Sequence, residues 1–140
     1  MRTRFGLGLG VALICVGLLP STAGAAAGLW DGLWKIRVEG GQPGKMCLKE
    51  TSRNYVEGKF QSEDPSKFGI IWGDLTRRDQ EWDGGFKDKG TGDKGSFHAE
   101  LGEAGRFDGS FKSRNAEQRL SWGGVRLDDD IGYNACVKTL

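Results

Sequence analysis

Apolar and polar side chains alternate along most of the chain after residue 28. Residues 107–112, Phe-Asp-Gly-Ser-Phe-Lys, show the pattern clearly, with aromatic residues and glycine at every second position. Successive side chains of a β-strand point to opposite faces, so this alternation predicts strands with one packed and one solvated face. The 24 glycines also favour strands, because each glycine in a helix interior costs about 1 kcal/mol.

The same short pattern recurs at a nearly constant interval. It consists of a large apolar residue, an acid, glycine, any residue and an aromatic residue. The four copies begin at Trp30, Val56, Trp82 and Phe107, in steps of 26, 26 and 25 residues, and a shortened form begins at Trp122. A fixed period indicates a repeated supersecondary unit, here a hairpin of two strands. The glycine on the packed face would let a neighbouring ring lie over the backbone and would permit sharp coiling.

Turn signals separate these strands. Gly40–Gly44, Asp64–Ser66, the glycine-rich run at 88–95 and Asp128–Asp130 divide the chain into short segments. The predicted strands are residues 30–39, 45–50, 54–62, 68–77, 82–87, 96–101, 106–113 and 119–127, with 133–139 as a ninth or closing strand. The sequence therefore predicts an all-β, antiparallel meander that closes as a small up-and-down barrel, the architecture of lipocalins and streptavidin. A flat or sandwiched sheet is the alternative.

The N-terminal segment has the pattern of a secretory signal peptide. Arg2 and Arg4 precede an uncharged apolar run from Phe5 to Leu19, and small residues follow up to Ala27. The run is shorter than the roughly 20 residues that span a bilayer, so a retained anchor is the weaker interpretation. We predict that residues 1–27 are cleaved, that residues 28–140 form one domain, and that the protein is periplasmic or secreted.

Charge and cysteine content support an exported domain. Without the two signal arginines, 18 Lys and Arg face 19 Asp and Glu, a net charge of −1. Such a balance offers neither the basic face expected of a nucleic-acid-binding protein nor a polybasic membrane patch. Cys47 and Cys136 remain after cleavage, and two cysteines in an oxidising compartment usually pair. The alternative is a reactive or metal-ligating thiol pair, but C-x-x-C spacing is absent.

Some strands resemble those of known proteins. The runs Gly69-Ile-Ile-Trp-Gly73, Trp82-Asp-Gly-Gly85, Arg106-Phe-Asp-Gly-Ser-Phe111 and Trp122-Gly-Gly-Val-Arg126 are similar to a group of uncharacterised bacterial secreted proteins with W-x-G and G-x-F-x-G strands. The similarity covers about half of the chain and rests on glycine and aromatic framework residues. The similarity implies a fold, and it implies no activity because that group has no established one.

Candidate catalytic and metal-binding chemistry is sparse. His98 is the only histidine and is predicted on the outer face between Phe97 and Ala99, with no G-x-S-x-G nucleophile motif in the chain. One histidine and a disulfide do not supply a zinc site. Asp128–Asp130 lack the spacing of a calcium loop, and the glycine-rich run at 88–95 lacks that of a phosphate loop, so both are interpreted as solvated turns, the second as a mobile hairpin tip. The acids of the repeated pattern are expected outside the barrel, paired with basic residues. We predict no catalytic residue, no metal and no cofactor.

The aromatic residues are the remaining candidates for function. Trp30 and seven further rings are expected on the inner face, and those seven are candidate ligand contacts: Trp34, Phe60, Trp82, Phe86, Phe107, Phe111 and Trp122. An eight-stranded barrel can hold one small molecule. We therefore expect a non-catalytic binding protein for a small apolar ligand. The alternative is an interaction or inhibitor module of the cell envelope with a filled core and an exposed apolar patch that includes Ile71 and Leu75.

Overall fold

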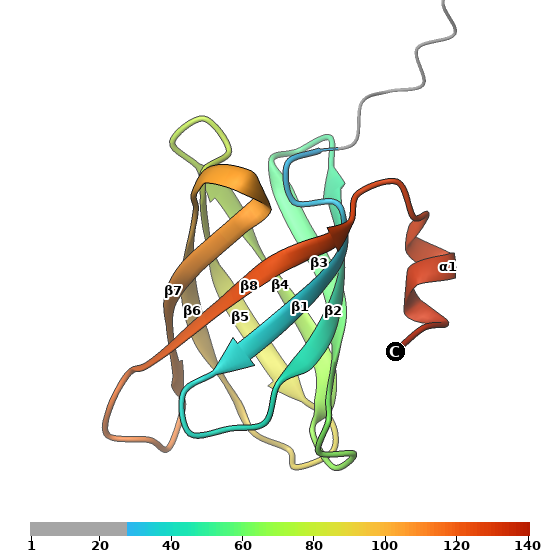
Figure 1. Cartoon of the computed structure of the whole chain (residues 1–140). Helices are drawn as coiled ribbons and strands as arrows, with labels where there is room; N and C mark the ends of the chain where they lie inside the picture. The colour runs from blue at the N-terminus through green and yellow to red at the C-terminus, as the bar shows by residue number, and fades with distance from the viewer. Residues whose placement is uncertain (1–27) are drawn as a thin grey trace, which may run out of the picture.

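Eight antiparallel strands follow one another in chain order, and the last pairs with the first to close a barrel (Figure 1). The structure is a computed structural model that describes residues 28–140, so the expected signal peptide lies outside the described residues. The elements are β1 (Gly32–Val38), β2 (Gly44–Thr51), β3 (Tyr55–Ser62), β4 (Phe68–Thr76), β5 (Glu81–Asp88), β6 (Lys94–Leu101), a 3₁₀ turn (Glu103–Gly105), β7 (Arg106–Ser113), β8 (Leu120–Asp128) and α1 (Tyr133–Val137). The predicted up-and-down barrel is confirmed.

The predicted inner face is correct for the four segments that share the sequence pattern. The four segments that share the sequence pattern lie at or in β1, β3, β5 and β7, and their apolar residues form one core with inward residues of the other strands. Ile71 and Leu75 belong to this core and are 5% and 8% exposed. Their proposed place on an exposed outer patch is therefore wrong. They alternate with Ile70, Trp72 and Asp74, which face outward, because side chains of one strand alternate between faces.

Glycines allow the tight coiling of the small barrel. Gly73 on β4 lies directly opposite Gly84 on β5, and both face inward. A side chain on either glycine would collide with the backbone of the other strand. Gly124 on β8 shows the other expected role of glycine, because the ring of Phe107 on the neighbouring strand lies over its backbone.

The C-terminal segment differs from the prediction. Residues 133–137 form helix α1 and not a ninth strand, and the helix lies outside the barrel beside β2 (Figure 1). No strand edge is left for a ninth strand, because β1 already pairs with both β2 and β8. Among residues 28–140, no helix has the length and apolarity that a membrane crossing requires.

The predicted disulfide Cys47–Cys136 is present, with 5.8 Å between the Cα atoms. It joins the outer face of β2 to α1, and not to a strand, as the predicted ninth strand at residues 133–139 would have required. The Lys49 ammonium lies 4.8 Å from the centroid of the Tyr133 ring and adds a second contact between the same elements. A disulfide of this kind fits an oxidising compartment.

Candidate ligand-binding site

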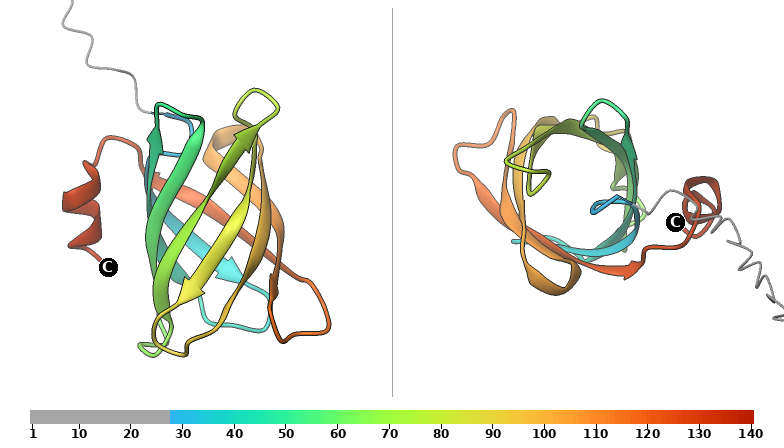
Figure 2. Two further views of the ribbon diagram at one scale, coloured as in Figure 1. Left: turned by 180° about the vertical axis from the view of Figure 1, so that it is seen from behind. Right: turned by 90° about the horizontal axis from the view of Figure 1, so that it is seen from above.

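One end of the barrel is closed by the N-terminal segment. Residues 28–31 turn into the barrel opening, and this segment is seen inside the ring of strands from above (Figure 2). The Trp30 side chain is fully buried there, with its ring centroid 5.8 Å from Trp34, 5.3 Å from Trp82 and 5.7 Å from Phe107. Trp30 was expected in the first strand, but β1 begins at Gly32, whose φ of +117° turns the chain.

Polar contacts hold this closing segment in place. The Trp30 indole N–H donates to the Asp79 carbonyl at 2.8 Å, and the Trp34 indole N–H donates to the Trp30 carbonyl at 2.9 Å. The Arg126 guanidinium, 5.2 Å from the Trp34 ring centroid, donates to carbonyls of the segment, the shortest contact being 2.6 Å to Leu29. The closed end therefore combines ring packing with hydrogen bonds from the Trp30 and Trp34 indoles, whereas the buried indole N–H of Trp82 has no partner among the described residues.

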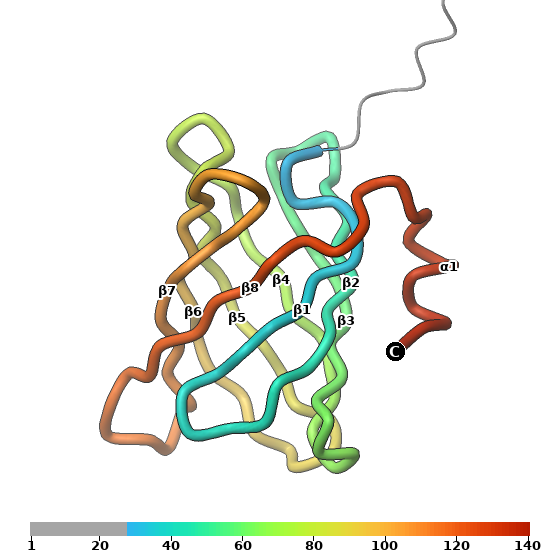
Figure 3. Tube along the Cα trace, viewed as in Figure 1, coloured from blue at the N-terminus to red at the C-terminus, as the bar shows by residue number. Residues whose placement is uncertain are grey.

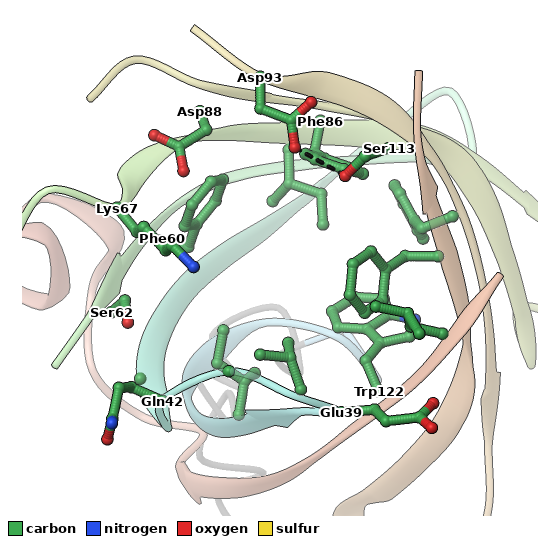
Figure 4. Close-up of a pocket in the computed structure, with 18 of the residues that line it drawn as sticks. Glu39, Gln42, Phe60, Ser62, Lys67, Phe86, Asp88, Asp93, Ser113 and Trp122 are labelled. Carbon is green, nitrogen blue, oxygen red and sulfur yellow. Dashed lines mark hydrogen bonds between the residues drawn. The ribbon is translucent and has the colours of Figure 1, made fainter. Parts of the chain in front are cut away.

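The other end of the barrel contains a cavity of about 300 Å³. Four loops surround its mouth, between β1 and β2, β3 and β4, β5 and β6, and β7 and β8, all at the end away from residues 28–31 (Figure 3). Its apolar wall includes Ile36, Met46, Phe60, Ile71, Phe86, Phe97, Phe111 and Trp122 (Figure 4). Pockets that bind small molecules begin at about this volume and have mostly apolar walls.

The seven predicted ligand contacts divide between the two ends. Four of them line the cavity: Phe60, Phe86, Phe111 and Trp122. Three are packed away from the cavity in the closed half: Trp34, Trp82 and Phe107, each at most 1% exposed. Strands β3, β5 and β7 run in the same direction, so the first apolar residue of each patterned segment lies near the closed end and the aromatic residue four positions later lies nearer the cavity.

Polar side chains follow the aromatic residues at the mouth of the cavity. Ser62 and Asp88 lie two residues beyond Phe60 and Phe86 on the same inner faces, and Ser113 does so on β7. Asp88 is only 7% exposed, and its Oδ1 accepts the backbone N–H groups of Gly90 at 2.9 Å and Thr91 at 3.0 Å.

Asp93 completes this polar arc. Its Oδ2 accepts the Ser113 hydroxyl at 2.6 Å (Figure 4). The sequence predicted a solvated hairpin tip at residues 88–95, but Asp88 and Asp93 of this segment line the cavity. The alternation of side chains could have predicted the inward position of Asp88. It lies two residues after the inward-facing Phe86, and strand β5 continues to Asp88.

The outer wall carries the paired charges that were expected there for three of the four patterned acids. Asp31 instead precedes β1 and accepts the backbone N–H groups of Gly28 and Glu50. Lys49 and Glu57 lie opposite each other on β2 and β3, with 3.3 Å between nitrogen and oxygen. His98 lies opposite Asp83, and its Nδ1 is 2.6 Å from Asp83 Oδ1 while its Nε2 is 3.2 Å from Glu100 Oε1. The hydrogen bond to Asp83, aided by Glu100, raises the pKa of His98 above its usual value, because both carboxylates favour the charged imidazolium.

Possible metal ligands are few on the part of the chain that the structure describes. One group of three, Glu81, His98 and Glu100, has ligand atoms within 4.8 Å of one another on the outer wall. These side chains are already engaged: Glu81 pairs with Arg77 at 3.0 Å and His98 with Asp83 and Glu100. This surface group lies on the outer wall, whereas the cavity opens inside the barrel.

The fold is similar to that of designed barrels. Neither the protein-family models nor the curated proteins gave a match. Among solved structures, the chain is similar to a redesigned β-barrel, b11L5F_LGL, with a TM-score of 0.61, 19% identity, and coverage of 74% of this chain and 96% of the other. It is also similar to the redesigned β-barrel mFAP1 bound to DFHBI, with a TM-score of 0.58, 16% identity, and coverage of 72% and 98%. At this identity the similarity shows the fold alone.

Proposed function

We propose that the chain is an exported, non-catalytic binding protein that holds a small, largely apolar ligand in the open half of its barrel. The observation that carries this proposal is the cavity of about 300 Å³, with the rings of Phe60, Phe86, Phe111 and Trp122 in its wall. A filled-core interaction module would not need this space. That mFAP1, a barrel of similar fold, binds DFHBI supports the idea that such a barrel can accept a ligand.

The packing of the closed half gives further support. Because the aromatic rings and hydrogen bonds of residues 28–34 stabilise that half, the open half can leave apolar surface unpaired without loss of the fold. Binding then requires little rearrangement, since the walls are strands of a closed barrel.

A cavity-filling substitution tests the proposal. Val38 faces inward near the mouth, whereas Lys35 lies on the outer face of the same strand. We expect the unsubstituted domain to bind 2-naphthylmethanol by isothermal titration calorimetry, Val38→Trp to weaken this binding at least about tenfold, and Lys35→Trp to leave it unchanged. Equal binding by all three proteins, or binding by none, would contradict the proposal.

A further inference from the structure

The cavity contains a buried carboxylate that is adjacent to its apolar wall. Asp88 is the last inward-facing residue of β5, two positions after Phe86, and among residues 28–140 it is the one charged residue that is buried. Charged side chains are almost never fully buried without a partner, because removal of the charge from water is costly. The question is therefore which groups compensate the negative charge of Asp88.

The partners that Asp88 has are neutral. Its Oδ1 accepts two backbone N–H groups, from Gly90 and Thr91. Two more carboxylates line the cavity with neutral partners: Asp93 accepts the hydroxyl of Ser113 and the N–H of Lys94, and Glu39 accepts the N–H of Ser121 at 2.7 Å. Within the part of the chain that the structure describes, none of these three carboxylates forms an ion pair; the ion pairs involve other acidic residues.

Negative charge is therefore in excess around the cavity. Lys67 is the single basic residue in its lining, against Glu39, Asp88 and Asp93. Apolar walls of low dielectric strengthen the field of such charges inside a cleft. We propose that the ligand is a cationic amphiphile, a small apolar body that bears an ammonium or guanidinium group, and that Asp88 is the counter-ion which receives this group. This inference rests on the proposed function and adds the charge of the ligand to it.

The geometry suits such a molecule. An apolar body would contact Phe60, Phe111 and Trp122, while its cationic end would lie at the mouth beside Asp88 and Asp93 (Figure 4). The ring of Phe86, two residues before Asp88, adds an aromatic face near the cation, and cations are attracted to such faces. A carboxylate ligand would instead meet the negative charges of Asp88 and Asp93 and would have to rely on Lys67.

Three naphthalene ligands of similar shape test the inference on the unsubstituted protein. They are 2-naphthylmethylamine, 2-naphthylmethanol and 2-naphthoate, which are cationic, neutral and anionic at pH 7. We expect calorimetry to show the amine binding about tenfold more tightly than the alcohol, as a charge-assisted hydrogen bond implies, and the carboxylate more weakly than both. Asp88→Asn should remove the preference for the amine and retain binding of the alcohol.

Asp129→Asn is the matched control, because it changes the net charge equally at an exposed position after β8, away from the cavity lining. It should keep the preference for the amine. Equal affinities for amine and alcohol would overturn the assignment of charge and leave the binding function intact. Tightest binding of 2-naphthoate would also overturn it and would make Lys67 the receiving group. Failure of all three ligands to bind would contradict the binding function itself.

Discussion

The two ends of the barrel use the same strands for opposite purposes. At the closed end, Trp30, Trp34, Trp82 and Phe107 pack with ring centroids 5.3–5.8 Å apart. The indole N–H groups of Trp30 and Trp34 donate to backbone carbonyls. At the open end, Phe86 and Phe111 lie 6.1 Å apart beside about 300 Å³ of space. The comparison indicates that stability is concentrated in one half, which leaves the other half free to bind.

The largest effect is expected from Trp30→Ala. Removal of a fully buried ring leaves a large void and removes the indole hydrogen bond to the Asp79 carbonyl, so we expect a loss of about 3–5 kcal/mol in the free energy of unfolding. Phe111→Ala at the open end removes a half-buried ring that already borders empty space, and about 1–2 kcal/mol is expected. Urea unfolding followed by far-UV circular dichroism measures both. Equal losses would show that the two ends do not differ in this way.

The disulfide is expected to matter next. Cys47 lies opposite Leu33 at the start of β1, so the cross-link lies toward the closed end, and it spans 89 residues. The double variant Cys47→Ser, Cys136→Ser should lose about 2–4 kcal/mol of stability through a less restricted unfolded chain. It should still bind 2-naphthylmethanol, since β1–β8 pairing closes the barrel without it. Loss of binding together with native circular dichroism would mean that the cross-link also shapes the cavity.

The smallest effect is expected on the wall between the two ends. His98 is the single histidine, so its titration by NMR is unambiguous. We expect its pKa above the usual value of about 6.5, and Asp83→Asn should lower it, because the bond to Asp83 is its main cause.

The same pKa shift predicts how stability depends on pH. A raised pKa in the folded state means that His98 stabilises the protein fully below its unfolded pKa and that this contribution is lost as pH rises through the folded value. His98→Gln should therefore cost less than about 1 kcal/mol at pH 5 and less still at pH 9, because the pair is partly exposed. A cost that does not change with pH would argue against a charged imidazole there.

Much of the fold was predictable from local pattern. Alternation predicted the strands, the barrel and the inward face of the patterned segments, and two cysteines predicted their pairing. For β4 it separated the two faces but did not say which one is inside, so Ile71 and Leu75 were placed wrongly. The prediction failed for residues 133–139, because this segment has no clear hydrophobic period. Whether it forms a strand or a helix depended on whether a strand edge of the barrel was free. The prediction failed also for Trp30, because a segment before the first strand can fold inward only once the barrel exists.

The candidate site was predictable in part. The inward direction of Phe60, Phe86, Phe111 and Trp122 follows from period 2, but so does that of Trp34, Trp82 and Phe107. Periodicity specifies which face of the sheet a side chain occupies, and it contains no information on depth along the barrel axis. Depth was needed to separate a cavity wall from a filled core.

By itself, the sequence determined the class of fold, which residues of each strand share a face, and the cysteine pair, because these depend on neighbours along the chain and on composition. The tertiary structure decided where the empty space lies. Residues 28–31 fill one end of the barrel, and Arg126, almost 100 residues later, donates hydrogen bonds to their carbonyls. The cavity lined by Asp88 lies at the opposite end. Which end is filled depends on contacts between residues far apart in the sequence, and these form only when the strands close.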